Sequence, residues 1–459
     1  MISSRRVSLI RPALVLAALG ALPALRTFAA PIRPLAQEHV VVGESPSPAT
    51  IPLYSPTILR LETGRLVAGY TRAKGGAAAD DAGGGDGDAE ILLTSDDHGA
   101  TWTKRAEVPR ALQGRVFRAS PTATGPLYYV SPGAGLPIIR SDDAGLTWPK
   151  PVLLTPADLV WQQTPANVWH ANGHVYLAFE RRNEVIAAWG PSEKALVLLR
   201  ARADADLTQR AAWTFSSELV FSDVVPGMRS NEINRTGLDF LGIPFFKQDY
   251  PNRAPVSTTP RRTMPPIGWV EPAVVQIVDP DHVWFDPTGH TFHLLGRAHT
   301  GGTGFACLTK VVENADGTMT MSLEHAPSGK AMLYLPLPGG QLRFHVTYDA
   351  KTKLYWLVGS QATDSMTRPD RMAKERFDLP YNERQRLVLH FSRNLVDWCF
   401  AGLVAKADGP RESRHYASMD IDGDDLVILS RSGDERAKSA HEGNLITFHR
   451  IKNFRELVY

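Results

Sequence analysis

An eight-residue pattern that occurs twice constrains the fold of this chain more than any other feature of its sequence. The segments 95–102 and 141–148 both read Ser-x-Asp-x-Gly-x-Thr-Trp. The aspartates, Asp97 and Asp143, can accept hydrogen bonds from N–H groups of a turn, and the glycine two residues later reaches positive φ without strain. The pattern therefore predicts two β-hairpin turns. In each, the returning strand begins at Thr-Trp and the tryptophan packs under the turn.

The rest of the chain repeats the same pattern, in which an apolar run is followed by a turn and a second apolar run. A degenerate third copy at 392–398 keeps the serine, an aspartate just before the tryptophan, and the tryptophan, but lacks the glycine. The repeating units cover about 54–110, 115–156, 160–222, 268–326, 330–406 and 414–455. Such periods are typical of propellers. We expect an all-β, six-bladed β-propeller that closes by pairing its last strand, 444–451, with N-terminal residues, which hides the edge strands.

The repeated turn resembles the Asp box, or BNR repeat, of the sialidase (neuraminidase) superfamily. This resemblance implies a sialidase-like six-bladed propeller over residues 30–459. The closing run 444–454 resembles that of uncharacterised exported sialidase-like proteins. The box is a structural element in the family rather than a catalytic one, so it predicts the fold more directly than the activity.

Residues 1–29 read as a signal peptide. A basic start leads into the apolar run 12–25, and small residues precede a cleavage site after Ala29. The run is too short for a stable membrane anchor, and no later segment is long and apolar enough to be one. We expect export to the periplasm or medium, with no membrane span after cleavage.

The composition limits the possible partners. The 37 glycines and 34 prolines suit many short strands joined by turns. A formal net charge of +2, without any run of Lys or Arg, does not indicate a surface that binds nucleic acid. Two cysteines, Cys307 and Cys399, are expected to be thiols rather than a disulfide framework. The histidine spacings match no zinc site. We expect a monomer that uses no metal or cofactor.

Two stretches depart from the repeat. Residues 223–267 are rich in Pro, Arg and Asn and predict a long loop insertion over one face. The segment 75–88 is composed of Gly, Ala and Asp and predicts a mobile loop. Long loops inside a compact domain are commonly functional.

The resemblance also implies a catalytic set. Sialidases cleave a sugar whose carboxylate lies on the anomeric carbon, and they use a tyrosine activated by a glutamate. In this chain the run Trp-Val-Glu-Pro places the glutamate at Glu271, and His-Tyr-Ala places the tyrosine at Tyr416. An aspartate on a mobile loop serves as acid and base in the family. Its position falls on Asp88, with Asp86 as the alternative.

Arginines that grip a carboxylate bidentately complete the family site. One is implied at Arg297, and another at Arg384 or Arg386, with Arg384 favoured. In the first unit Tyr54 stands where the family has an arginine, and this departure argues against sialic acid as the substrate. We assign Tyr54 and His415 to substrate binding. The resulting function is an exo-α-sialidase-like glycoside hydrolase that acts on an acidic sugar or glycan.

Two other functions remain open, because propellers host many activities. One is a polysaccharide lyase on the same scaffold that uses His415 or His170 with Tyr416 to remove a proton beside a uronate. The other is a non-catalytic carbohydrate-binding propeller. The run Glu180-Arg181-Arg182 at the end of a strand in the third unit is a further candidate for lining the funnel.

Overall fold

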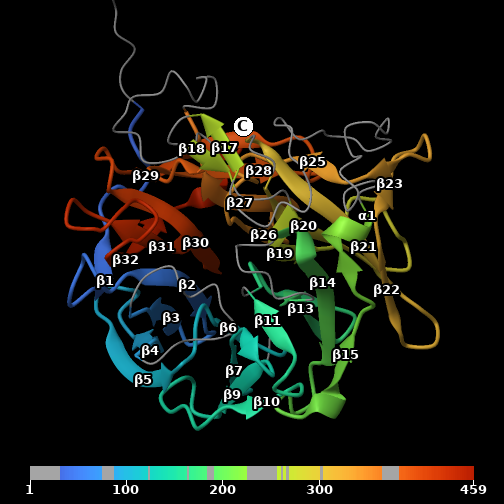
Figure 1. Ribbon diagram of the computed structural model, residues 1–459, viewed down its shortest axis with the longest axis horizontal. Helices are drawn as coiled ribbons and strands as arrows, with labels where there is room; N and C mark the ends of the chain where they lie inside the picture. Colours follow the sequence, from blue (N-terminus) through green and yellow to red (C-terminus); the bar gives the residue numbers. More distant parts are fainter. Residues whose placement is uncertain are drawn as a thin grey trace, which may run out of the picture. The chain divides into compact units, whose positions relative to one another are not determined.

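Antiparallel sheets are arranged around a central axis in residues 34–459, which form an all-β propeller (Figure 1). The computed structural model describes residues 32–74, 87–121, 125–162, 165–182, 191–224, 256–259, 262–264, 268–299, 303–363 and 382–459. The predicted signal peptide, most of the 223–267 insertion and the segment 75–86 lie outside these ranges. No helix among the described residues is long and apolar enough to cross a membrane.

Among the described residues, five sheets are regular blades of antiparallel strands. The first contains β2 (Leu53–Arg60), β3 (Leu66–Arg72), β4 (Ala89–Ser95) and β5 (Thr103–Pro109), and the second β6 (Arg115–Arg118), β7 (Leu127–Val130), β9 (Pro137–Ser141) and β10 (Val152–Leu153). The next contains β19 (Gly268–Val275), β20 (Thr291–His299), β21 (Phe305–Glu313) and β22 (Met319–Ser322), with β25 (Tyr334–Pro336) beside β21. The other two comprise β26 (His345–Asp349), β27 (Leu354–Ser360), β28 (Arg386–Ser392) and β29 (Cys399–Lys406), then β30 (Ser413–Asp422), β31 (Asp425–Gly433), β32 (Leu445–Ile451) and β1 (Val40–Glu44).

The sheet between the second and third of these blades is larger and irregular. It contains β8 (Gly133–Ala134), β11 (Val160–Gln162), β12 (Trp169–Ala171), β13 (His174–Arg182), β14 (Lys194–Arg202), β15 (Trp213–Phe215) and β16 (Leu219–Val220). Two strands, β11 and β12, both pair with β13, and β11 also pairs with β8. The structure therefore shows five regular blades, and the expected count of six is not confirmed.

Short elements complete the described chain. They are α1 (Phe221–Val224), the hairpins β17 (Val256–Thr259) with β18 (Arg262–Met264) and β23 (Glu324–His325) with β24 (Ala331–Met332), and 3-10 turns at Pro191–Glu193, Arg210–Ala212 and Phe454–Leu457. Both cysteines are free thiols, with Cys307 buried and Cys399 partly exposed.

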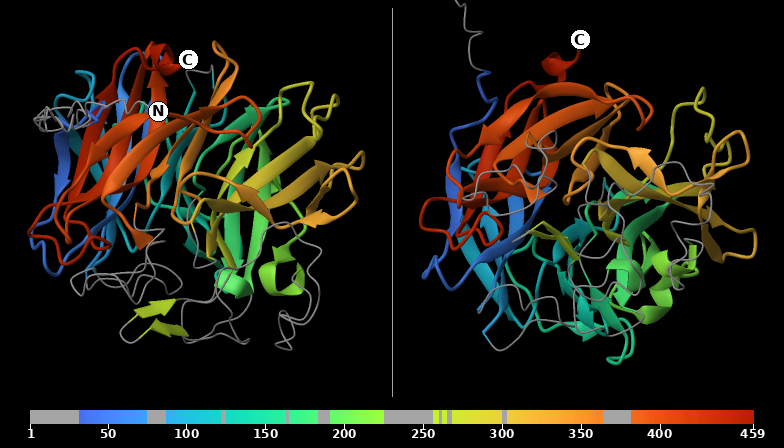
Figure 2. Two further views of the ribbon diagram at one scale, coloured as in Figure 1. Left: turned by 90° about the horizontal axis from the view of Figure 1, so that it is seen from above. Right: turned by 45° about the horizontal axis from the view of Figure 1, so that its top comes forward.

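The chain closes as expected. The N-terminal strand β1 pairs antiparallel with the C-terminal strand β32, with Val40 opposite Phe448 and Glu44 opposite Leu445. Figure 2 shows consecutive sheets side by side around the axis. Residues from both ends of the chain thus complete one blade, which leaves no open edge between the first and last sheets.

The predicted turn contacts are present. In the first turn Asp97 Oδ1 accepts the N–H of Thr101 at 2.8 Å, Gly99 has a φ of 92°, and Trp102 Nε1 donates to the Gly99 carbonyl at 3.1 Å. The second copy repeats all three features. A Cβ on Gly99 would lie 2.3 Å from the ring of Phe448 in β32, so the glycine also permits close packing between the first and last blades.

The degenerate third copy forms a similar turn by different means. Asn394 Oδ1 accepts a hydrogen bond from the N–H of Asp397 at 2.8 Å. The asparagine thus accepts the turn hydrogen bond that an aspartate accepts in the other copies. Leu395 takes the left-handed conformation of the missing glycine, with φ of 63°. Trp398 Nε1 donates to the Leu395 carbonyl at 3.1 Å, as the other tryptophans do.

Buried polar side chains join the inner strands at the axis. Arg115 on β6 donates from Nη1 to Ser418 Oγ of β30 at 2.9 Å. Asn167 donates to the carbonyls of Val274 in β19 and Val346 in β26, at 2.8 and 3.0 Å. Each side chain therefore ties together strands that are far apart in sequence, and the axis is closed by hydrogen bonds rather than by apolar packing alone.

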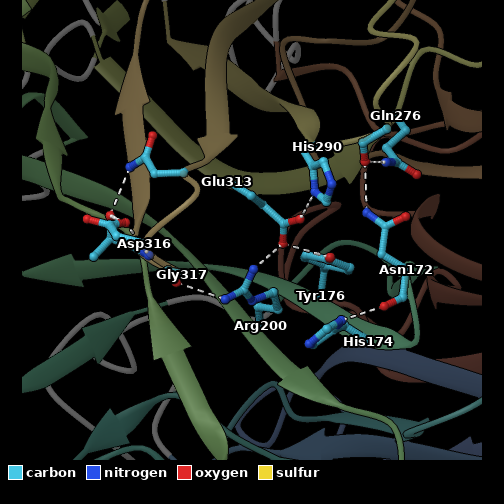
Figure 3. Close-up of polar contacts among 12 residues, drawn as sticks. Asn172, His174, Tyr176, Arg200, Gln276, His290, Glu313, Asp316 and Gly317 are labelled. Carbon is cyan, nitrogen blue, oxygen red and sulfur yellow. Dashed lines mark hydrogen bonds and ion pairs between the residues drawn. The ribbon is translucent and has the colours of Figure 1, made fainter.

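A polar network on the outer side links β13 and β14 to β21 (Figure 3). The carboxylate of Glu313 accepts hydrogen bonds from Tyr176 at 2.8 Å and Arg200 at 2.6 Å, and contacts His290 at 2.7 Å. Burial acts to raise the pKa of Glu313, but the hydrogen bonds from His290, Arg200 and Tyr176 outweigh it, so this pKa is lowered. The network holds two adjacent sheets together.

We expect Glu313→Gln to destabilise the protein by about 2 kcal/mol at pH 7, because hydrogen bonds to a charged acceptor are lost. A carboxyl group whose folded pKa is lowered stabilises the fold above its unfolded pKa of about 4.3, and this contribution disappears as the pH falls through the folded pKa. Urea unfolding at pH 7 and near pH 3 should therefore show a difference between wild type and variant that shrinks at the lower pH. An equal difference at both pH values would contradict the assignment.

Candidate active site

Three inner strands carry the same backbone irregularity at corresponding positions. Pairing shifts register between Tyr54 and Thr57 in β2, between Val270 and Ala273 in β19, and between His415 and Ser418 in β30. Within these bulges the residues Ser55, Glu271 and Tyr416 have positive φ angles of 35°, 55° and 47°. A β-bulge re-aims a side chain, and non-glycine residues in this conformation cluster at functional sites.

Tyr416 and Glu271 come together through Arg297 of β20. The Nη1 atom of Arg297 lies 2.5 Å from the Tyr416 hydroxyl and 3.4 Å from Glu271 Oε2. The Nε of Arg297 donates to the carbonyl of Gln341 at 2.8 Å, which orients the guanidinium. All three side chains are buried, with exposures of 5% for Tyr416, 1% for Glu271 and 6% for Arg297. The structure thus brings together three residues that the sequence analysis selected separately.

Arg384 lies on another side of the tyrosine. Its guanidinium carbon is 5.0 Å from the centre of the Tyr416 ring. Its Nη1 contacts His415 Nδ1 at 2.9 Å, and its Nη2 donates to Asn382 Oδ1 at 2.5 Å. The neighbouring candidate Arg386 instead pairs with Glu383. Of the two arginines proposed for this position, the structure places Arg384 beside Tyr416.

Sequence reasoning missed Arg431 of β31. Its guanidinium carbon lies 4.0 Å from the ring centre of Tyr54 and 5.3 Å from that of Tyr416. It is 2% exposed, and its Nη2 donates to the carbonyl of His441. Burial, followed by repulsion from Arg384, lowers the pKa of Arg431 to about 10 against attraction from Tyr54, Tyr416 and Glu271. A buried arginine in an apolar strand requires a polar or charged partner. The presence of Arg431 in such a strand was the sequence signal that could have identified it.

A buried ion pair, Glu180 with Lys194, contacts the backbone at Glu271. The backbone N–H of Glu271 donates to Glu180 Oε1, and Glu180 Oε2 lies 3.1 Å from Lys194 Nζ. The Lys194 carbonyl accepts a hydrogen bond from Trp269 Nε1 at 2.9 Å, so this residue contacts β19 as well. Burial raises the pKa of Glu180 to about 7, partly offset by Lys194. Of the run Glu180-Arg181-Arg182, it is the glutamate that reaches the site.

Further charge lies deeper along the axis. Arg343, 3% exposed, donates from Nη2 to the Pro165 carbonyl at 3.3 Å. Burial lowers its pKa, and Glu271 and Tyr416 are the largest influences that raise it. Glu90 of β4 is fully buried, and burial raises its pKa to about 8 although Thr71 donates to it at 2.9 Å. Neither Arg343 nor Glu90 was selected from the sequence.

The histidines around the arginines are neutral. Burial is the main cause of pKa values well below the ordinary range for His299, His415 and His441, and Arg384 lowers each of them further. Neutral imidazoles leave the arginines as the main positive charges around Tyr416. His415 is in ring contact with Tyr416, with centroids 4.9 Å apart, and its role in substrate binding stays a prediction.

Two further candidates, Asp88 and His170, also contact other parts of the chain. Asp88, 7% exposed, accepts the backbone N–H of Lys74 at 2.6 Å through its carboxylate, and its carbonyl accepts that of Arg110 at 2.8 Å. It therefore links Lys74 and Arg110 on two different strand ends, and Asp86 lies outside the described residues. His170 lines a cavity of about 440 Å³ with Asp420, near the end of β30 opposite to Tyr416. That position separates His170 from the tyrosine.

Solved structures similar to this chain include glycoside hydrolases with a propeller fold. The Hadza microbial sialidase Hz136 matches with a TM-score of 0.52 and 13% identity over 90% of this chain and 68% of that one. A mutant of Trypanosoma rangeli sialidase displaying trans-sialidase activity matches with a TM-score of 0.50 and 14% identity over 94% of this chain and 61% of that one. The α-L-arabinofuranosidase Arb93A from Fusarium graminearum matches with a TM-score of 0.46 and 11% identity over 92% of this chain and 99% of that one.

The similarities to the two sialidases, with TM-scores of 0.52 and 0.50, support the propeller fold. No protein-family model matches the sequence, and no curated protein does. The chain spans 61% of the T. rangeli mutant, so that enzyme has substantial additional structure. At identities of 11–14%, an activity for this chain has to be argued from its own residues.

Proposed function

We propose that this protein is an exported sialidase-type glycoside hydrolase that removes an acidic sugar from a glycan. The supporting observation is the contact of one Arg297 nitrogen with both the Tyr416 hydroxyl and the Glu271 carboxylate, at 2.5 and 3.4 Å. Both residues sit at positive φ in bulges of inner strands. A phenol, a carboxylate and buried guanidinium groups in one place suit attack on a sugar that itself carries negative charge.

The proposed reaction has two steps. In the first, Tyr416 loses its proton to Glu271 and its oxygen bonds to the anomeric carbon, while the glycosidic bond breaks and Asp88 protonates the leaving oxygen. In the second, water bonds to that carbon and gives a proton to Asp88, while the bond to the Tyr416 oxygen breaks and the phenol regains its proton from Glu271. Arg297 donates to the phenol oxygen and so stabilises the charge that builds there as the proton leaves. Arg297 and Arg384 face the acidic group of the substrate in this proposal.

Several finer features belong to the same proposal. We take the irregular sheet β8–β16 as a sixth blade and the turns at 95–102 and 141–148 as Asp boxes of the sialidase superfamily. The first 29 residues would direct export to the periplasm or medium, and the mature chain would act as a monomer. Sequencing the N-terminus of the secreted protein and measuring its mass in solution test these two points.

A lyase is the second candidate. The observation that favours it is the neutral, fully buried His415 in ring contact with Tyr416, since a neutral imidazole can accept a proton from the carbon beside a uronate. The location of His170 near the opposite end of β30 leaves His415 as the base in this alternative. A lyase makes an unsaturated product that absorbs in the ultraviolet, and a hydrolase makes none.

One assay separates these functions. The mature protein is incubated with 4-methylumbelliferyl sialic acid, with uronic-acid and sulfated glycans, and with neutral glycosides, and both fluorescence and unsaturated product are followed. We expect hydrolysis of an acidic member and none of its neutral counterpart. Unsaturated product would indicate the lyase. Binding of acidic glycans without turnover would indicate a carbohydrate-binding propeller and contradict the proposed function.

A further inference from the structure

A cavity of about 440 Å³ lies on the propeller axis, at the end of the inner strands away from Tyr416. Five sheets contribute to its wall, through Leu59 of β2, Phe117 of β6, His170 of β12, Thr347 of β26 and Asp420 of β30. The strands β2, β6, β26 and β30 surround the axis in Figure 1. Pockets that hold small ligands commonly enclose about 300–1,000 Å³, so one sugar ring fits here.

Hydrogen bonds across the axis separate this cavity from the candidate active site. Tyr416 and Asp420 are four residues apart in β30, which is about 13 Å along a strand. Between them, Ser418 Oγ accepts a hydrogen bond from Arg115 Nη1 at 2.9 Å. The other nitrogens of Arg115 donate to two backbone carbonyls at 2.5 to 3.2 Å. Arg115 is thus fully engaged with the protein, and the cavity and Tyr416 are separate locations.

Three polar side chains at the cavity retain unused hydrogen-bonding capacity. Among the described residues, the Arg118 guanidinium forms no hydrogen bond or ion pair, while the Arg118 carbonyl accepts a hydrogen bond from His170 Nε2 at 2.9 Å. Burial lowers the pKa of His170, so its Nδ1 is left as an acceptor on a neutral ring. Asp420 accepts the backbone N–H groups of Arg60 and Ile421, one on each oxygen, at 2.7 and 2.8 Å. Each carboxylate oxygen can accept a second hydrogen bond.

The charges of Arg118 and Asp420 oppose each other at this cavity. Burial raises the pKa of Asp420, and the backbone N–H groups of Arg60 and Ile421, followed by the charge of Arg118, offset part of that rise. The charge of Arg118 also lowers the pKa of His170. One donor and two acceptors therefore lie close together. This mixture differs from the candidate active site, where arginines are the main charges and suit an acid.

An aromatic ring completes the wall of the cavity. Tyr348 of β26 is half-buried and lines the cavity. Its ring centre is 5.0 Å from that of Tyr355 and 6.4 Å from that of Trp169, and Trp169 Nε1 donates to Gln276 at 3.0 Å. These contacts hold the Tyr348 ring in place. An aromatic face packs against the C–H groups of a sugar ring, and the sugar hydroxyls both donate and accept hydrogen bonds.

We propose that this cavity is a second carbohydrate site, which binds an uncharged hexose unit of a glycan through Arg118, His170 and Asp420, with the sugar ring against Tyr348. A guanidinium donor beside two acceptors matches neighbouring hydroxyl groups, which donate and accept at once. An acidic sugar is disfavoured because its carboxylate would meet Asp420. Such a site requires no catalysis. It retains the protein on a polymer that carries its substrate, since a second contact raises the overall affinity.

The test is ligand-observed NMR on the full mature chain, with saturation transfer to methyl β-D-glucopyranoside, methyl β-D-galactopyranoside and methyl α-D-mannopyranoside. We expect wild type to bind at least one of these glycosides with a Kd of about 1–10 mM, the scale for one ring held by a few hydrogen bonds. N-acetylneuraminate should not displace the bound glycoside, because that acid is expected to bind beside Tyr416.

Two variants remove the second site in different ways. Arg118→Met keeps most of the side-chain stem and removes the donor, and should weaken glycoside binding at least about 10-fold, as expected for a charge-assisted hydrogen bond. Thr347→Phe fills the cavity without removing any side-chain hydrogen bond present among the described residues, and should abolish binding. The Tm of Arg118→Met should stay within about 2 °C of wild type. The matched control is Arg436→Met, since Arg436 is half exposed and pairs with Asp434 and Glu44.

Three results overturn the inference. They are the failure of all three glycosides to bind wild type, binding by Arg118→Met as tight as that of wild type, and displacement of the glycoside by N-acetylneuraminate, which would place it beside Tyr416. If Thr347→Phe does not fold, Arg118→Met decides the question alone. A loss of binding by Arg118→Met with an unchanged Tm, while Arg436→Met binds as wild type does, supports the second site.

The outcomes are independent of the proposed function. Glycoside binding that depends on Arg118, without turnover of any acidic glycan, supports the second site and contradicts the hydrolase. Turnover of an acidic glycan by a protein that binds none of the three glycosides supports the hydrolase and contradicts the second site.

Discussion

Tyr416→Phe is expected to lower turnover of the acidic glycoside by roughly 10³-fold or more, because it removes the oxygen that attacks the anomeric carbon. The substituted ring still fills the space between Arg384 and Arg431, whose guanidinium carbons lie 5.0 and 5.3 Å from the tyrosine ring centre. Binding of the acidic sugar should therefore stay close to that of wild type. The measurement is kcat from a fluorescent glycoside, together with the Kd of the acid product.

The control for this variant is Tyr459→Phe. Tyr459 is 85% exposed, and its hydroxyl makes one long contact, 3.4 Å, with the Phe400 carbonyl. Its kinetics should match those of wild type. Ordinary turnover by Tyr416→Phe would rule out the tyrosine as nucleophile. A loss of binding as large as the loss of turnover would mean that the hydroxyl serves substrate recognition rather than chemistry.

Glu180→Leu should have the largest effect on stability. This change removes a buried carboxylate 3.1 Å from Lys194 and the acceptor of the Glu271 N–H. Breaking a buried ion pair by removing one partner typically costs about 3 kcal/mol or more. We expect a loss of that size in urea unfolding, together with loss of activity, because the bulge that carries Glu271 at positive φ is no longer held.

Two further variants separate the contributions of the pair. Glu180→Gln keeps an oxygen for the Glu271 N–H and should retain more activity than Glu180→Leu. The double variant Glu180→Leu, Lys194→Met removes both charges and should recover part of the stability but little activity. Full activity in Glu180→Leu would exclude a positioning role for this carboxylate.

The same residue makes a prediction about pH. Burial raises the folded pKa of Glu180 to about 7. A carboxyl group with a raised folded pKa contributes stability that is complete below its unfolded pKa of about 4.3 and is lost as the pH rises through the folded value. Glu180→Gln should therefore reduce the fall in unfolding free energy that wild type shows between pH 4 and 7. If the unfolding free energy of Glu180→Gln falls between pH 4 and 7 as steeply as that of wild type, the pKa of Glu180 is not raised.

Local sequence was sufficient for the residues that lie in inner-strand motifs. Glu271 and Tyr416 were selected because Trp-Val-Glu-Pro and His-Tyr-Ala match the segments that carry the glutamate and the tyrosine in the family that the chain resembles, and the structure brings both to Arg297. The sequence favoured Arg384 over Arg386 but left both as candidates, since both stand near the start of one strand. Their partners, His415 for Arg384 and Glu383 for Arg386, distinguish them.

Residues on the second and third strands of the sheets were mostly missed. Arg431, Lys194 and Glu90 occur in apolar strands without any motif, and a charged residue there can face a ligand, a partner or solvent. Arg431 lies opposite His415 in the pairing of β30 with β31, beside Tyr416, and it also stacks on Tyr54, a residue more than 350 positions away in the chain. No pattern along the sequence records such a contact, because it depends on closure of the propeller.

The sequence by itself determined the hairpin turns, the pairing of neighbouring strands and the closing of the last strand on the first. The turns depend on hydrogen bonds between groups a few residues apart, as from the Thr101 N–H to Asp97, and the strand pairing depends on the alternation of apolar residues. The tertiary structure decided how many blades are regular, because β11 pairs with both β13 and β8 and the short strand β12 also pairs with β13. It also decided the pKa shifts of the candidate site, because desolvation and charge act through space. The arginines near Tyr416 come from different blades, so their distances are set by the tertiary structure.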